Sequence, residues 1–191
     1  MKQNIVRNEE SGSKAIEITQ MALMTAIICV STMFIQIPTV MGIGYDHLGD
    51  SMVFFAAILF GRKKGAITAA VGMSLADLLT AHAYYVPFTF VIKGVMALIA
   101  TTIAYRGDYE GKNVINNIFA FAVAGAWMVF GYFVTKIILV KFVLMKVNTF
   151  GEALALGLAG IPNNIGQVTV GAILAIPLIK LLQGRLNIKR Y

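Results

Sequence analysis

The sequence predicts an all-α integral membrane protein in which residues 1–191 form a single domain, a compact bundle of six transmembrane helices. Hydrophobic residues make up 58% of the chain and charged residues only 13%, with a mean hydropathy of +0.77. A soluble domain of this length cannot bury so much apolar surface. A segment needs a length of about 20 residues to cross a bilayer. Apolar stretches near this length follow one another along the chain and leave little room for a soluble domain.

The predicted helices cover residues 16–35, 49–61, 65–82, 88–105, 116–141 and 156–183. The second stretch is short for a full crossing. Thr149 and Glu152 stand at the spacing of a capping box, so a short helix is expected before the last one. Pro162 suits the first turn of that last helix.

Basic residues gather at four places: the first 14 residues, the turn expected at 62–64, the connection after the fourth helix and the C-terminal end. With six crossings, all four places fall on one side of the membrane. The positive-inside rule makes that side cytoplasmic, so both termini, including the polar segment 1–14, are expected there. The net charge of +7 therefore reflects topology and not nucleic-acid binding.

One face of the first helix carries small side chains. Ala15, Thr19, Ala22, Ala26 and Cys29 recur at spacings of four and three residues, which places them in one stripe. In lipid, small residues allow another helix to approach closely. Two interpretations remain open, namely contact with another helix of the same chain and a docking face for a separate membrane subunit.

Polar and aromatic side chains cluster in the half of the bundle that lies away from the basic rim. The opposite half is expected to hold almost nothing polar beyond that rim, which disfavours a continuous path for ions. Aromatic walls with a few converging hydrogen-bonding groups are typical of a small-molecule site. The asymmetry predicts a pocket open to the outside. Its candidate substrate-binding residues are Tyr45, His47, Asp50, Tyr84, Tyr85, Lys93, Tyr132, Lys136, Asn163, Asn164 and Gln167.

Several of these residues also have structural interpretations. Asp50 is placed to cap the second helix. Tyr84 and Tyr85 match the aromatic belt of a membrane interface, and the amide side chains at the start of the last helix suit hydrogen bonds between helices. Lys93 either pairs with Asp77 or contacts the ligand.

The sequence contains no H-E-x-x-H, no G-x-S-x-G and no P-loop, so neither an enzyme nor a chain that binds ATP itself is expected. His47 with Asp46 and Asp50 lacks a third well-placed ligand, and no metal or other cofactor is predicted for this chain. Energy for transport would then come from a partner. The alternative is a stand-alone secondary carrier or channel for a small solute.

The whole chain resembles the S-component, or substrate-binding subunit, of the energy-coupling factor (ECF) vitamin transporters. The resemblance rests on the length, six predicted helices with both ends inside, a long first outer loop before a short helix, and Ala22-Leu-Met-Thr-Ala26 as the family's A-x-x-x-A pattern. The segment Tyr45-Asp-His-Leu-Gly-Asp50 resembles the branch for hydroxymethylpyrimidine or pyridoxine-like substrates. The segment departs from the L-x-D-x-S pattern of the members that bind riboflavin or pantothenate. These two vitamins are therefore the alternative substrates.

The resemblance implies a mechanism and a set of partners. The subunit takes a vitamin from outside into a site built from the first loop and helices four to six. It then docks by Ala22 and Ala26, with Ala15 and Thr19 on the same face, onto a transmembrane coupling subunit. Two ABC-type ATPase subunits use the ATP, and the S-component topples in the membrane to deliver its site. The implied location is the bacterial cytoplasmic membrane, as a multi-pass protein.

Overall fold

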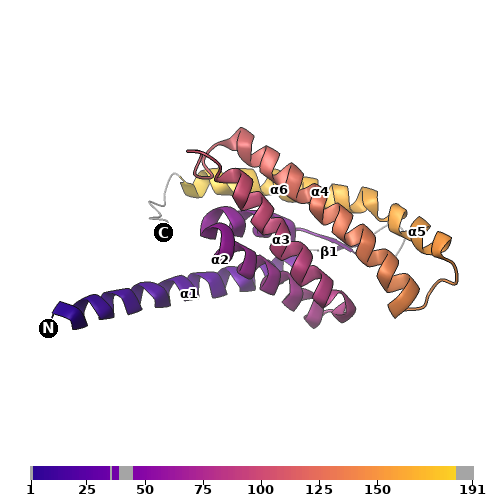
Figure 1. Cartoon of the computed structure of the whole chain (residues 1–191), viewed down its shortest axis with the longest axis horizontal. Helices are drawn as coiled ribbons and strands as arrows, with labels where there is room; N and C mark the ends of the chain where they lie inside the picture. The colour runs from indigo at the N-terminus through magenta and orange to yellow at the C-terminus, as the bar shows by residue number, and fades with distance from the viewer. Residues whose placement is uncertain (1, 35, 39–44, 184–191) are drawn as a thin grey trace.

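A computed structural model of the chain describes the backbone of residues 2–34, 36–38 and 45–183, and the side chains of 14–34 and 47–181. Within these ranges the protein is a helical membrane protein with one small two-stranded antiparallel sheet, β1·β2 (Figure 1). The elements are α1 (Lys2–Phe34), β1 (Gln36–Pro38), β2 (Tyr45–His47), α2 (Gly49–Leu79), the 3₁₀ helix η1 (Ala83–Tyr85), α3 (Val86–Ala104), α4 (Val114–Ile138), the π-helical η2 (Leu139–Val143), α5 (Phe150–Ala159) and α6 (Ile161–Gln183).

Four segments of the described chain are long and apolar enough to cross a bilayer. They are Lys14–Phe34, Ala83–Ala104, Val114–Val143 and Phe150–Leu181. Each contains or extends one of the stretches that hydropathy selects in the sequence, apart from differences of a few residues at the ends. The prediction of a helical membrane protein is therefore confirmed.

Two predicted helices, 49–61 and 65–82, are joined in α2, which reverses direction at Gly61. This glycine has φ +76° and ψ −166°, a backbone conformation that side chains with a Cβ rarely adopt. A Cβ at Gly65 would lie 2.9 Å from the carbonyl oxygen of Ala56, so the arms 49–60 and 62–79 pack side by side in opposite directions. The prediction of a separate basic turn at 62–64 is wrong, because these residues continue the helix directly after the reversal.

Side chains from α3 and its C-terminal end cap the first arm of α2. The last carbonyl groups of a helix have no partner within that helix. Thr101 Oγ1 donates a hydrogen bond to the Ala57 carbonyl oxygen over 3.1 Å, and the Tyr105 hydroxyl donates to that of Ile58 over 2.6 Å. These hydrogen bonds satisfy carbonyl oxygens that have no partner within the first arm because the helix reverses.

α2 packs against α1, α3 and α6, and α4 packs against α3, α5 and α6. Phe54 of α2 stacks on Phe121 of α4 with ring centroids 4.2 Å apart in the buried core. α1 lies at one side of this assembly, and its N-terminal half extends away from the other helices (Figure 1). α2 therefore lies at the centre of the molecule, between α1, α3 and α6.

Two of the sequence predictions for the chain after α4 are confirmed. Thr149 Oγ1 accepts from the Glu152 backbone N–H over 3.2 Å, and the Glu152 carboxylate accepts from the Thr149 N–H, which completes the capping box of α5. α6 begins at Ile161, so Pro162 lies in its first turn.

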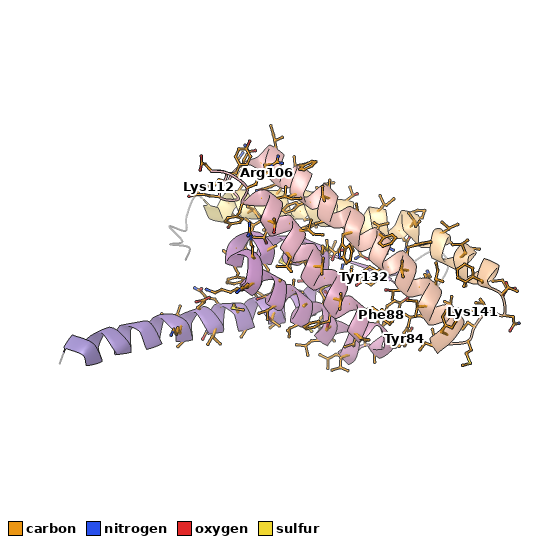
Figure 2. All side chains as sticks on the ribbon, viewed as in Figure 1. Tyr84, Phe88, Arg106, Lys112, Tyr132 and Lys141 are labelled. Carbon is orange, nitrogen blue, oxygen red and sulfur yellow. The ribbon has the colours of Figure 1, made fainter. Side chains whose placement is uncertain are left out.

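The prediction that polar side chains are almost absent from the half with the basic rim is wrong. Asn116 and Asn117 of α4 are 4% and 3% exposed, near the end of the bundle where Arg106 and Lys112 lie (Figure 2). Their Nδ2 groups donate to the carbonyl oxygens of Ile103 and Gly111, over 2.8 and 2.7 Å. Asn116 thus bonds the last turn of α3, and Asn117 bonds the connection between α3 and α4.

Gly65→Ala is expected to destabilise the protein by about 1–3 kcal/mol, because the new methyl group meets the backbone of the opposite arm of α2. Gly166→Ala in α6 is the matched control, since a Cβ there meets nothing within 4 Å. Thermal unfolding in detergent measures both. Equal midpoints for the two variants would contradict the close packing of the arms.

Candidate functional site

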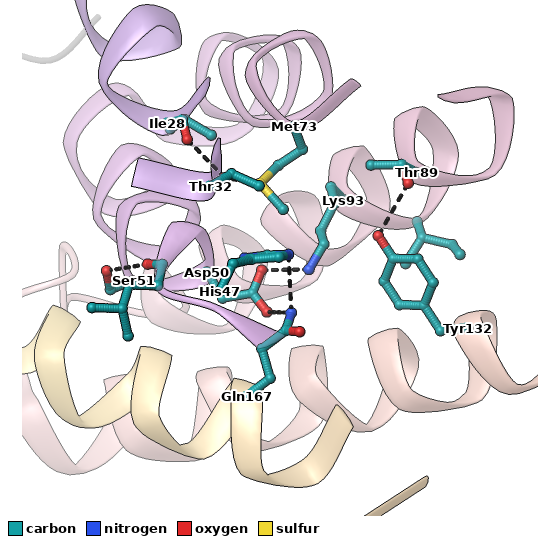
Figure 3. Close-up of polar contacts among 12 residues, drawn as sticks. Ile28, Thr32, His47, Asp50, Ser51, Met73, Thr89, Lys93, Tyr132 and Gln167 are labelled. Carbon is teal, nitrogen blue, oxygen red and sulfur yellow. Dashed lines mark hydrogen bonds and ion pairs between the residues drawn. The ribbon is translucent and has the colours of Figure 1, made fainter. Parts of the chain in front are cut away.

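The site is built around an ion pair that is removed from solvent. Lys93 of α3 donates a hydrogen bond to Oδ1 of Asp50 in the first turn of α2, and both side chains are 0% exposed (Figure 3). Burying two charges costs several kcal/mol per ion unless they pair closely and their remaining polar atoms are satisfied. The pairing therefore explains how a lysine is accommodated within a membrane-spanning segment.

The structure corrects two interpretations of these residues. Lys93 pairs with Asp50 and not with Asp77. Asp50 does not cap α2, because the N-cap position is Leu48 and no side chain caps it. Ser51 Oγ instead donates to the Leu48 carbonyl oxygen over 2.6 Å.

Two further side chains complete what we call the polar cluster: His47, Asp50, Lys93 and Gln167. Gln167 Nε2 of α6 donates to Asp50 Oδ2 over 2.6 Å and lies 3.4 Å from Nε2 of His47 in β2. Both carboxylate oxygens of Asp50 are thus satisfied. Residues from β2, α2, α3 and α6 meet at this one point (Figure 3).

A glycine one turn beyond Gln167 brings α6 close to the start of α2. A Cβ at Gly171 would lie 2.9 Å from Asp50 Cβ and 3.2 Å from the Ser51 backbone nitrogen. A larger side chain would push the helices apart, so Gly171 is what allows the Gln167 amide to reach Asp50. Gly171 was not predicted from the sequence, although its spacing of four from Gln167 places both residues on one face of a helix.

His47 is neutral at physiological pH. It lies in β2, outside the helices, and burial lowers the pKa of its imidazole from 6.5 to about 4, while the nearby Asp50 and Lys93 act in opposite directions. The polar cluster therefore holds one negative and one positive charge, with a sum of zero.

Aromatic side chains flank the ion pair. The Tyr132 ring centroid lies 5.2 Å from Lys93 Nζ, and the Tyr132 hydroxyl is 3.2 Å from Thr89 Oγ1. The Tyr85 ring lies edge-on to that of Tyr132 at 6.4 Å, and Tyr84, which is 37% exposed, follows at 5.1 Å from Tyr85. The three predicted tyrosines that the structure describes with side chains thus lead from the surface to the ion pair.

Three other predicted residues lie at the junction of α5 and α6. A Cβ at Gly160 would be 3.3 Å from Lys136 Nζ, which places this ammonium group at the junction of α5 and α6. Asn163 and Asn164 are partly exposed in the first turn of α6, and their side chains make no hydrogen bond to the described residues. The Tyr45 side chain is outside the described residues.

The small-residue stripe of α1 faces outward. Ala15, Thr19, Ala22 and Ala26 are all exposed, whereas Cys29 at the end of the stripe is buried.

The buried face of α1 holds Met24, Ile28 and Thr32, and Thr32 Oγ1 contacts Met73 Sδ of α2 at 3.2 Å. Packing against the helices that the structure describes does not explain the four exposed residues.

The four long apolar helical segments define a multi-pass membrane protein. The chain belongs to the family described as ECF-type riboflavin transporter, S component, whose model matches residues 13–184. It is also 31% identical over 105 residues, 55% of this chain and 68% of the other, to an uncharacterized protein in gap 3'region of Pyrococcus woesei. The family consists of substrate-binding subunits of a transporter and not of enzymes, and it implies partnership with other ECF components.

Asp50→Asn and Lys93→Met are each expected to cost about 3–5 kcal/mol of stability, because each leaves a buried charge alone. The double variant should lose less than the sum, since no charge remains. Lys64→Met is the control, because Lys64 pairs with Glu17 at 44% and 35% exposure and its loss should cost no more than about 1 kcal/mol. Additive losses in a double-mutant cycle would contradict the pairing.

Stability should fall as the pH drops from about 6.5 to about 4. The unfolded chain protonates His47 near 6.5 and the folded chain only near 4, so the unfolded state binds the extra proton in this window. The loss amounts to about 3 kcal/mol and is complete below pH 4. Denaturation at a series of pH values measures it, and the same slope in His47→Gln would assign it to other groups.

Proposed function

We propose that this chain captures a small water-soluble vitamin or vitamin precursor from outside the cell for ATP-driven import. The observation that carries this proposal is the family match over 13–184. The buried polar cluster supports it, because converging charged, amide and aromatic groups are what a small-molecule site requires. The proposal includes six crossings, with the two arms of α2 counted separately, and both termini on the cytoplasmic side of a bacterial cell membrane.

The proposed partners are a transmembrane coupling subunit and two ABC-type ATPase subunits, which bind the ATP. The exposed stripe of α1 supports docking on the coupling subunit, because it offers small side chains that no described helix of this chain covers. This chain supplies binding and no hydrolysis, and no cofactor of its own is proposed.

The proposed substrate is a flat heterocyclic vitamin. The family's description names riboflavin, whereas the segment from Tyr45 to Asp50 favours hydroxymethylpyrimidine or pyridoxine. Each of these has a ring that stacks on tyrosine and groups that exchange hydrogen bonds with an amide or a charged side chain. Tyr85, Tyr132 and Gln167 are proposed to supply those contacts.

Mass spectrometry of small molecules that co-purify with the chain tests this function, followed by calorimetry with the identified compound. The proposal expects a stoichiometric heterocyclic vitamin. Sustained uptake by the purified chain alone in liposomes, without ATP or partners, would contradict it and support the stand-alone carrier.

Ala22→Trp and Ala26→Trp are each expected to abolish uptake by the complete transporter while ligand binding stays within about twofold. An indole at these exposed positions blocks the close approach of another helix. Gln20→Trp and Ile27→Trp are the controls, since both side chains are exposed on other faces of the same helix. Loss of ligand binding in the alanine variants, or equal loss of uptake in the controls, would assign the stripe another role.

A further inference from the structure

The charges of the polar cluster are balanced before any ligand arrives. Asp50 Oδ1 accepts from Lys93 and Asp50 Oδ2 accepts from Gln167, and both charged side chains are 0% exposed. No described carboxylate other than that of Asp50 lies within 4 Å of the Lys93 ammonium. The cation is therefore already matched.

We infer that Asp50 determines specificity by charge, so that the site takes a ligand that is uncharged where it meets the cluster and refuses carboxylates and phosphates. This inference rests on the proposed function and deepens it, since it selects among substrates. A vitamin recognised through a neutral ring fits, and a carboxylate such as pantothenate does not.

The reason is the cost of leaving a buried charge alone. An anionic ligand can contact Lys93 only if it displaces Asp50 from Lys93 or shares Lys93 with Asp50. In both cases the Asp50 carboxylate is buried beside a second negative charge. A cationic ligand meets the same difficulty at Lys93. An uncharged ring with a donor or an acceptor leaves the pair intact and exchanges hydrogen bonds with Gln167, whose amide both donates and accepts.

Gly171 and Gln167 fix Asp50 in this role. A Cβ at Gly171 would lie only 2.9 Å from Asp50 Cβ, so the backbone of α6 packs directly against Asp50. Its second oxygen is held by Gln167 at 2.6 Å. Asp50 is thus a specificity-determining residue because of where it is held, and no direct contact with the ligand is required.

The first experiment removes Asp50 and supplies a small anion. Asp50→Ala leaves a space next to Lys93, and formate at millimolar concentration is expected to raise the thermal midpoint of this variant by mass action. Formate should leave the midpoints of the unmodified chain and of the Asp50→Ala/Lys93→Met variant unchanged. An equal response of all three proteins, or none in Asp50→Ala, would overturn the inference.

The second experiment compares matched ligands and needs no variant to fold. Calorimetry on the unmodified chain measures riboflavin against riboflavin 5′-phosphate, and pyridoxine against 4-pyridoxate. The neutral member of the pair that binds is expected to bind at least roughly 100-fold tighter, and Asp50→Asn should reduce that ratio. If mass spectrometry identifies another vitamin, its charge at pH 7 tests the same inference: a neutral compound agrees with it and an anion contradicts it.

Charge selection and the capture of a vitamin can be contradicted separately. Equal affinity for the neutral and anionic members, or an anionic co-purified vitamin, would overturn charge selection while the capture function stands. A chain that binds no vitamin and supports no uptake with its partners would contradict the proposed function, and the inference about its ligand with it.

Discussion

The buried contact between Lys93 and Asp50 is the interaction on which the rest of the site depends. A lysine inside a membrane-spanning helix is tolerated only when its charge is matched or faces water. Here the match comes from another element, the first turn of α2, and the remaining carboxylate oxygen is satisfied from α6 by Gln167. The pair therefore joins α2, α3 and α6 at one point, beside the strand that carries His47.

The path of α2 makes this convergence possible. The reversal at Gly61 lets one element contribute two antiparallel arms to the centre of the bundle, and side chains of α3 and its C-terminal end cap the carbonyl groups of the first arm. Gly171 then allows α6 to approach the start of that arm closely. Small residues at close contacts and polar groups that satisfy backbone atoms are the means by which helices pack in membranes.

The helical stretches and the capping box of α5 could be predicted because hydropathy, periodicity and capping are local properties of the chain. The partner of Lys93 could not, since Asp50 is 43 residues away and its local pattern resembles an N-cap. Asn116 and Asn117 were missed for the same reason, because their partners are the carbonyl oxygens of Ile103 in the last turn of α3 and of Gly111 in the connection that follows. The four residues of the polar cluster were predicted as site residues because polar side chains are unusual in such apolar segments. Which of them pair depends on tertiary packing, and this was not predictable.

An experimental structure of the purified chain with its vitamin bound is the measurement that most directly tests whether the polar cluster is the binding site. We expect the ring to lie against Tyr85 or Tyr132, with a polar atom within hydrogen-bonding distance of Gln167 and with Lys93 still paired to Asp50. A ligand bound away from all of these side chains would show that the ion pair only stabilises the fold.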